Sequence, residues 1–386
     1  MKHHEIIVVG GGVVGAAIAL GLHQAGVDVA LVERGAHPPA YDPHDYDLRV
    51  YAISPASRKF LNSLGVWNGI SQQRISPYQH MQVWDEMPVK SLHFSADDLG
   101  VNELGYIVES SLILCCLWAG FQALPCYLNT AISAFETDET ATRLTLADGE
   151  TISARLVIAA EGKDSPLREW SGIDCLRWDY PQQAVICHVS TEKPHKGTAW
   201  QRFLPEGPLA FLPLMDGRSS IVWSSSAAAS LLALNDEAFC ELLSTSMHLR
   251  LGRVTGCTRR LGFPIGLLHA SEMVRPRLAL AGDAAHVVHP LAGQGVNLGL
   301  ADAEALITEM QSAFEHKRDP GNLRVLKRYE RVRRADILDM LAVTDGLHRA
   351  YARRFAGWDD LRNLGMSAVN RLPPIKNALM RRALGV

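Results

Sequence analysis

The sequence is poor in cysteine and has no long hydrophobic run. Its 386 residues include seven cysteines, an odd number without a Cys-x-x-Cys spacing, which argues against a disulfide framework and for a reducing compartment. The longest uninterrupted apolar run, Leu112–Phe121, has ten residues, about half the length of a membrane span. We therefore expect a cytoplasmic protein, either free in solution or in peripheral contact with the inner membrane face.

Signatures of several other classes are also absent. The chain has no internal repeat or low-complexity tract, and no Ser-His-Asp arrangement or carboxylate pair in a recognisable catalytic motif. His286 and His289 are three residues apart, but without a third ligand or a His-Glu-x-x-His frame we expect no metal site. Glu5 and the missing small-residue cleavage site argue against a secretory signal peptide.

The composition is that of a large globular protein. Hydrophobic residues make up 47% and charged residues 20%, so a chain of this length is expected to form more than one domain. The net charge is −3, and we expect no nucleic-acid partner. From Lys317 onward, however, there are 16 Lys and Arg against 7 Asp and Glu. This basic tail is either a contact surface for a membrane or partner, or an ordinary solvated helical face.

A glycine-rich loop follows the first predicted strand. Ile6–Val9 is a continuous run of apolar, β-branched residues, as expected of a strand buried on both faces of a parallel sheet. Gly10 then permits a tight turn, Gly12 lets the backbone approach a pyrophosphate, and Gly15 lets the next helix pack closely on the strand. This order of features predicts dinucleotide binding.

An acidic residue at a suitable distance supports this prediction. A second strand is predicted over Val27–Val32, and Glu33 follows it. Such a carboxylate accepts hydrogen bonds from the adenosine ribose hydroxyls and repels a ribose phosphate, so FAD or NAD fits better than NADP. The alternative is a coincidental glycine-rich turn, but strand, glycines, helix, strand and acid stand here in register.

A second loop of this kind lies about 270 residues later in the chain. The apolar strand Leu278–Ala281 leads into the acidic turn Gly282-Asp283, and Gly293 and Gly295 precede a helix. Apolar residues recur along that helix at Val296, Leu300, Ala303 and Ile307. Its start offers unpaired backbone N–H groups and the positive end of a dipole, which suit an anionic group. Two such loops can hold the opposite ends of one long cofactor.

The order of the predicted elements indicates an α/β fold with an inserted β-sheet. Residues 1–75, 104–180 and 264–320 have the pattern of a Rossmann-like dinucleotide-binding domain. Residues 76–103 and 181–263 are expected to form a β-sheet substrate domain. Within it, the strand candidates are 80–95, 184–190, 209–214 and 220–224. Residues 321–386 are predicted to be helical.

Several motifs together resemble a known family. They are the first glycine loop with Glu33, Leu48-Arg49-Val50, Gly105-Tyr106-Ile107-Val108-Glu109, Ala159-Ala160-Glu161-Gly162, Phe211-Leu212-Pro213-Leu214 and the segment from Gly282 to Asn297. Their order resembles the aromatic flavoprotein monooxygenases, and in particular their ubiquinone-biosynthesis branch. The similarity extends over nearly the whole chain. It implies an FAD-binding fold of the aromatic hydroxylase type with FAD as cofactor, O₂ as co-substrate, and NADH or NADPH as reductant.

The resemblance also implies roles for individual residues. Those implied to bind FAD are Gly10, Gly12, Val13, Val14, Gly15, Glu33, Arg34, Arg49, Glu109, Gly282, Asp283, Gly293, Gln294, Gly295, Val296 and Asn297. The substrate pocket would be lined by Pro290, where ring and flavin meet, and by Phe211 and Pro213, whose alternative is plain core of the inserted sheet. No side chain is assigned as a catalytic acid or base, because a flavin hydroperoxide is implied to attack the ring.

One position departs from the family pattern. Glu161-Gly162 stands where the family usually has Asp-Gly, and the extra methylene changes the reach of the carboxylate. We expect a tolerated variant. The departure puts the role of Glu161 in question, and not the fold.

The implied activity is hydroxylation of the aromatic ring of a polyprenylated quinol or phenol in ubiquinone biosynthesis. Alternatives on the same fold are another ring position, another aromatic substrate, reduction of prenyl double bonds, or halogenation, whose two-tryptophan signature is absent. An alternative of another class is a flavoprotein scaffold of a ubiquinone-biosynthesis complex. The sequence leaves the oligomeric state open.

Such a substrate would reside in the bilayer, which gives the basic tail a possible role. We expect the region beyond residue 320 to pack partly on the dinucleotide-binding domain and to present a salt-sensitive basic surface to a membrane or partner. The residues expected on that surface are Arg331, Arg333, Arg334, Arg349, Arg353 and Arg354.

Overall fold

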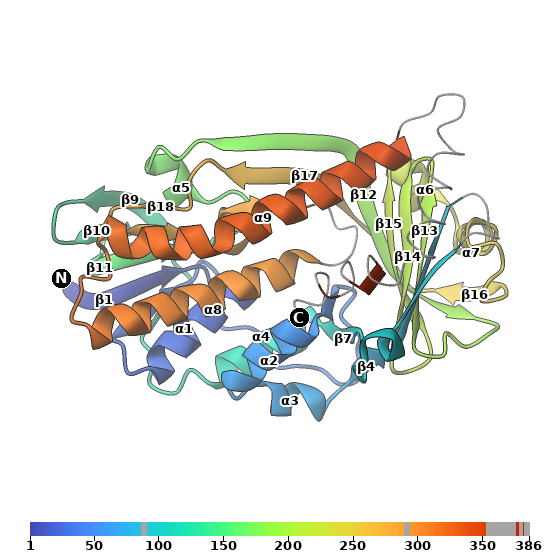
Figure 1. Ribbon diagram of the computed structural model, residues 1–386, viewed down its shortest axis with the longest axis horizontal. Helices are drawn as coiled ribbons and strands as arrows, with labels where there is room; N and C mark the ends of the chain where they lie inside the picture. Colours follow the sequence, from blue (N-terminus) through green and yellow to red (C-terminus); the bar gives the residue numbers. More distant parts are fainter. Residues whose placement is uncertain (86–90, 289–293, 353–375, 378–380, 382–386) are drawn as a thin grey trace.

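Two large β-sheets and one small sheet organise the protein (Figure 1). The computed structural model describes residues 1–85, 91–288, 294–352, 376–377 and 381. The first large sheet lies at the end of the molecule that carries the N-terminus, and the second lies at the opposite end (Figure 1). The mixed α/β fold that the sequence predicts is confirmed.

The first sheet has eight strands and a parallel centre. Its strands are β1 (Lys2–Val9), β2 (Val29–Val32), β8 (Cys126–Tyr127), β9 (Ile132–Thr137), β10 (Thr142–Leu146), β11 (Thr151–Ala159), β18 (Val274–Arg275) and β19 (Leu278–Leu280). The order is β18-β19-β11-β1-β2-β8, with β10 and β9 beside β11, and the pairs from β19 to β8 are parallel. Ile6, Ile7 and Val8 are completely buried, as expected for a central strand covered on both faces.

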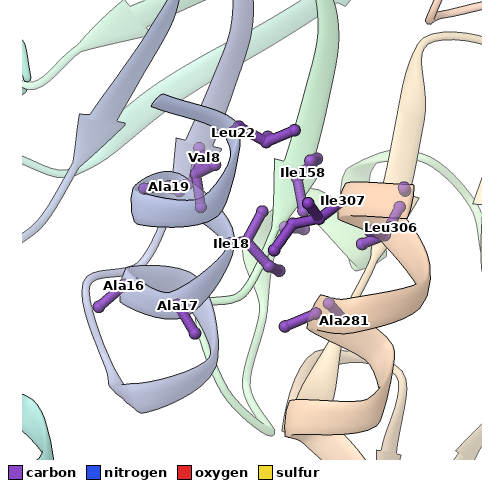
Figure 2. Close-up of a cluster of buried hydrophobic side chains, with 14 of the residues drawn as sticks. Val8, Ala16, Ala17, Ile18, Ala19, Leu22, Ile158, Ala281, Leu306 and Ile307 are labelled. Carbon is purple, nitrogen blue, oxygen red and sulfur yellow. The ribbon is translucent and has the colours of Figure 1, made fainter. Parts of the chain in front are cut away.

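Helices α1 (Val13–Gln24) and α8 (Gln294–Glu315) pack beside each other on this sheet. Figure 2 shows Ile18 of α1 and Ile307 of α8 in the same apolar cluster, next to strand β11. Gly21 makes room for this contact, because a Cβ there would lie 2.3 Å from Cδ1 of Ile307. The predicted apolar stripe of α8 is confirmed, since Leu300 and Ala303 are completely buried.

The second sheet has nine strands. They are β5 (His80–Trp84), β6 (Leu92–Ser95), β12 (Cys175–Thr191), β13 (Thr198–Leu204), β14 (Gly207–Pro213), β15 (Ser219–Ser225), β16 (Val254–Cys257), β17 (Leu261–Ala270) and β20 (His286–Val287). The order is β20-β17-β12-β15-β14-β13-β5-β6, with β16 beside β12, so the strands expected between residues 80 and 95 do join this sheet. One face packs on α6 (Ala228–Ala233) and α7 (Asp236–Ser246) through a core that includes Trp84, Trp223 and Phe239.

A small sheet and several short helices complete the described fold. Strands β3 (Val50–Ile53), β7 (Gly105–Glu109) and β4 (Ile75–Tyr78) form the small sheet in that order. The remaining elements are α2 (Pro55–Ser63), α3 (Trp67–Ser71), α4 (Ser110–Ala119), α5 (Pro166–Trp170) and the 3₁₀ turns η1 (Ala96–Leu99) and η2 (Gly282–Ala284).

The strands β12 and β17 connect the two ends of the molecule. They pair antiparallel from Cys175 opposite Ala270 to Ile186 opposite Leu261. Both strands therefore continue across the domain boundaries that we expect at residues 180 and 264. The division of the chain into domains stays a prediction.

The C-terminal helix α9 (Leu323–Ala352) packs on α8 and β18. Its Tyr329 is completely buried and donates a hydrogen bond to the carbonyl of Leu280 at 2.8 Å. The predicted packing of the tail on the dinucleotide-binding fold is thus confirmed for the first part of α9, which includes Tyr329. Within the described residues, no helix is both long and apolar enough to cross a membrane.

The structure corrects one member of the predicted basic surface. Arg331 and Arg334 are exposed on α9, but Arg333 is only 5% exposed and forms a buried ion pair. Arg333 therefore does not belong to a contact surface. The side chain of Arg349 and the residues Arg353 and Arg354 lie outside the described part of the chain.

Candidate functional site

A cavity of about 1810 Å³ lies between the two large sheets. It is lined by the first glycine loop, the turn at Asp283, the start of α8 and one face of the second sheet. Pockets for single small ligands usually measure roughly 300–1,000 Å³. The cavity is therefore large enough for an extended cofactor together with a second ligand.

The first glycine loop has the geometry of a dinucleotide cradle. Gly10 has a φ of +103°, and a Cβ there would lie 2.4 Å from the carbonyl oxygen of Ala160. A Cβ at Gly15 would lie 1.9 Å from the carbonyl oxygen of Gly10, so α1 packs closely on the strand. At Gly12, in contrast, a Cβ would meet no atom within 4 Å, and this residue lines the cavity. The backbone at Gly12 is thus open to a ligand, and the neighbouring Val13 and Val14 also line the cavity.

Glu33 reaches back to this loop from the end of β2. Its Oε2 accepts a hydrogen bond from the backbone N–H of Gly11 at 2.5 Å, and its Oε1 accepts one from Gly35 at 2.8 Å. Each carboxylate oxygen has more than one lone pair, so both retain capacity for ribose hydroxyls. Glu33 and Arg34 line the cavity, and their contact with the adenosine end of the cofactor stays a prediction.

The second loop lines the same cavity as the first. Gly295, Val296 and Asn297 line it at the start of α8, and a Cβ at Gly295 would meet no atom within 4 Å. The Asn297 side chain accepts a hydrogen bond from the N–H of Ser54 at 3.0 Å and donates one to the carbonyl of Ala52 at 2.8 Å. The Asn297 side chain therefore fastens α8 to β3 beside the cavity. Pro290 and Gly293, and the side chain of Gln294, lie outside the described residues.

Asp283 opens into this cavity between the two loops. Although it is open to the cavity, the surrounding protein displaces water and raises the pKa of its carboxyl, which His286, Arg49 and Lys163 partly oppose. Arg49 also lines the cavity, with its guanidinium 5.5 Å from the ring centre of Phe263. Glu161 lines the cavity as well and accepts a hydrogen bond from Ser165 at 2.6 Å, and burial raises its pKa.

A buried charge network that the sequence reasoning missed holds the Asp283 turn in place. The completely buried Asp302 of α8 accepts hydrogen bonds from Nε2 of His286 at 2.6 Å and from the N–H of Gly282 at 2.9 Å. Its other oxygen accepts a hydrogen bond from Nε of Arg333 at 2.8 Å. Burial alone would raise the pKa of Asp302, but the charges and hydrogen bonds of His286 and Arg333 outweigh it and lower that pKa.

His286 is thus engaged with a carboxylate. His289, the other histidine considered as a metal ligand, lies outside the described residues. Among the residues that the structure describes, no group of three or more His, Cys, Asp and Glu side chains is placed to hold a metal ion.

Glu109 is placed differently from the other predicted cofactor residues. It is buried and accepts hydrogen bonds from Arg74 at 2.9 Å, from the hydroxyl of Tyr41 at 2.8 Å and from the N–H of Asp47 at 2.9 Å. It is not among the residues that line the cavity. These contacts show Glu109 fixing the segment before Arg49, and a direct contact with the cofactor stays a prediction.

The prediction that Phe211 and Pro213 of β14 line the substrate pocket is wrong, because the cavity-facing residues are their neighbours in the strand. Phe211 is buried in the core between the second sheet and its helices, and neither Phe211 nor Pro213 lines the cavity. Successive side chains of a strand point to opposite faces, so Ala210 and Leu212 face the cavity instead.

One large cavity is lined by the open glycine backbones of both loops, by Glu33 and Asp283, and by the helix starts beside the loops, and this arrangement fits FAD. Together with the fold, it defines a FAD-dependent monooxygenase of the aromatic hydroxylase type. The chain belongs to the FAD-binding domain family, whose model matches residues 3–343. Binding of FAD, as the sequence predicts, is therefore confirmed.

Two relatives agree with this assignment, and a solved structure shares the fold. The chain is 37% identical to "3-demethoxyubiquinol 3-hydroxylase" of Escherichia coli, over 99% of this chain and 98% of that protein. It is 36% identical to "Ubiquinone hydroxylase UbiL" of Rhodospirillum rubrum, over 100% of this chain and 90% of that protein. The structure of Klebsiella pneumoniae HpxO complexed with FAD and uric acid shares the fold, with a TM-score of 0.76 at 19% identity, over 99% of this chain and 97% of that chain.

Proposed function

We propose that this protein hydroxylates the aromatic ring of a polyprenylated quinol or phenol in ubiquinone biosynthesis. The specific reaction that we propose is 3-demethoxyubiquinol 3-hydroxylation. The observation that carries the proposal is the 37% identity to the Escherichia coli enzyme of that name over 99% of this chain. The co-substrate is O₂, the reductant is NADH or NADPH, and the partners are the quinol and other proteins of the same pathway.

The shape and lining of the cavity support this substrate class. Beyond the loops, the cavity continues over an apolar region formed by Met81, Val83, Leu92, Phe94 and Phe203 on β5, β6 and β13. Apolar walls with few polar groups suit a long hydrocarbon chain. A ring near the glycine loops and a prenyl chain over this region would together use the length of the cavity.

In this proposal, the residues of the chain bind and orient the cofactor and stabilise its charge. Bound FAD supplies the chemistry of oxygen transfer to an electron-rich ring. The backbones at Gly12 and Gly295 allow close approach of the cofactor, and Asp283 offers a carboxylate to a cofactor hydroxyl. The positive end of the α8 dipole would stabilise negative charge on a cofactor bound there.

The proposal predicts a reaction that depends on the substrate. Purified protein loaded with FAD should consume O₂ and NADH or NADPH faster when a short-chain demethoxyubiquinol is added. Mass spectrometry should find a product one oxygen atom heavier. The matched control is the corresponding ring that already carries the hydroxyl group at the target position, which should not be converted.

A protein that merely scaffolds a complex would bind FAD but form no heavier product. Conversion at another position of the same ring would keep the hydroxylase assignment and correct the substrate. Testing the quinol precursors of each ring hydroxylation in the same assay separates these outcomes.

We further propose that the protein is cytoplasmic and contacts the inner membrane face through α9, where Arg331 and Arg334 are exposed. Each basic residue near an anionic bilayer contributes about 1 kcal/mol. Replacing both arginines with Glu should therefore weaken sedimentation with anionic liposomes by at least about 2 kcal/mol at low salt, with FAD content unchanged.

The matched control reverses two exposed charges elsewhere, at Lys59 and Lys193. This variant has the same net charge but keeps the α9 surface. If both variants bind liposomes equally, the contact is general or absent, and α9 presents an ordinary solvated face.

A further inference from the structure

Ser220 and His188 are two of the polar residues on the mainly apolar, cavity-facing side of the second sheet. On β12, β14 and β15 this side presents Ala184, Ile186, Leu212 and Val222. His188 of β12 lies directly opposite Ser220 of β15, and Ser220 lies opposite Leu212. Residues that pair across strands share one face of a sheet, so His188 and Ser220 both point to the cavity side. Ser220 lines the cavity, and His188 lies next to it.

Both side chains are buried without a hydrogen-bond partner. Ser220 and His188 are each 1% exposed. Among the described residues, neither the hydroxyl of Ser220 nor either ring nitrogen of His188 has a hydrogen-bond partner. An unsatisfied buried polar group is costly, and most such groups in proteins are paired. Three unpaired polar atoms on adjacent residues at a cavity wall therefore indicate a place for a ligand with its own polar atoms.

The surroundings keep His188 neutral and fix its ring. Tyr46 contacts it edge-on, with ring centres 5.6 Å apart, and the guanidiniums of Arg74 and Arg218 lie over Tyr46 at 3.9 and 5.1 Å. Burial, and then the charge of Arg218, lower the pKa of His188 to about 4, with Asp216 opposing. A neutral imidazole has one donor and one acceptor nitrogen.

We infer that Ser220 binds an oxygen substituent of the substrate ring and that His188, its cross-strand neighbour, completes the polar end of this pocket. A hydroxyl group both donates and accepts, so this pair matches a phenol or quinol hydroxyl better than a methyl ether, which cannot donate. The inference rests on the proposed function, because it assigns the polar end of the ring pocket within that same site.

Ligand binding to the FAD-loaded protein tests the inference without turnover. The probes are a methoxyphenol with a short prenyl chain and its methyl ether, titrated against the flavin absorbance spectrum. The parent should bind the phenol about 10-fold more tightly than the ether, as expected for one net hydrogen bond. Ser220→Ala should lose this preference by weakening phenol binding, whereas Ser220→Thr, which retains a hydroxyl, should keep most of it. His188→Leu should lower the preference, and His188→Gln, which retains a donor and an acceptor, should restore part of it.

Ser219 provides the matched control. It directly precedes Ser220 in β15, is equally buried and points to the other face of the sheet. Its hydroxyl likewise has no hydrogen-bond partner in the described part of the chain. Ser219→Ala should bind both probes as the parent does.

The outcomes separate this inference from the proposed function. If the parent prefers the phenol but Ser220→Ala keeps that preference, or Ser219→Ala loses it equally, the inference is overturned and the function stands. If the parent binds neither probe and hydroxylates no quinol, the proposed function fails and the inference fails with it.

Discussion

Asp302→Asn is expected to destabilise the folded protein by about 3–5 kcal/mol and to lower its FAD content, because it breaks a buried ion pair on one side. The carboxylate accepts hydrogen bonds from His286, Gly282 and Arg333. An amide replaces one acceptor oxygen by a donor, so at least one of these groups would face a donor, and Arg333 would lose its buried counter-charge. Urea unfolding and the absorbance ratio of flavin to protein measure the two effects.

Asp336→Asn is the matched control, since Asp336 accepts a hydrogen bond from the same arginine at 2.6 Å but is 62% exposed. An exposed ion pair contributes no more than about 1 kcal/mol, so this variant should unfold almost like the parent. If the two substitutions lower the free energy of unfolding by the same amount, the buried network does not stabilise the Asp283 turn.

The difference in unfolding free energy between the parent and Asp302→Asn should depend on pH, which provides a second check. The pKa of Asp302 is lowered in the folded state, so its contribution to stability is present above the ordinary carboxyl pKa of about 3.9. It is lost as the pH falls through the lowered pKa. The difference in unfolding free energy between the parent and Asp302→Asn should therefore shrink below about pH 4.

Features that depend on short stretches of sequence could be predicted. The strand before Gly10, the open backbone at Gly12 and the position of Glu33 follow from residues within one βαβ unit, where each glycine has a steric reason. The apolar stripe of α8 is equally local. These features are sufficient to indicate the fold and the cofactor.

Features that depend on contacts between distant segments could not be predicted from the sequence. Asp302 pairs with Arg333 and Glu109 pairs with Arg74 across separate elements, and no spacing rule connects those positions. The error at Phe211 has a related cause, because an apolar strand with core on one side and a cavity on the other gives no signal for which face is which. A signal that could have found Asp302 is an acidic residue next to Ala303 in a buried stripe.

Gly12→Val is expected to weaken FAD binding by about 10- to 100-fold while leaving the fold intact. Gly12 has a φ of −66° and a ψ of −179°, an extended conformation that valine adopts readily. A Cβ there meets no protein atom within 4 Å and would occupy cavity space that a pyrophosphate needs. Forcing extra methyl groups into a packed contact costs about 1–3 kcal/mol, which corresponds to the expected loss of affinity. Titration of the flavin-free protein with FAD, followed by fluorescence quenching, measures it.

Gly256→Val is the control that isolates the cavity. Gly256, in β16, likewise has an open Cβ position and no positive φ, but it does not line the cavity. Both variants should unfold at similar urea concentrations without FAD, because a Cβ at either position meets no protein atom within 4 Å. Only Gly12→Val should lose FAD-dependent stabilisation. If Gly12→Val binds FAD as tightly as the parent and as Gly256→Val, the cofactor does not approach the backbone at this loop, and the first glycine loop has a purely structural role.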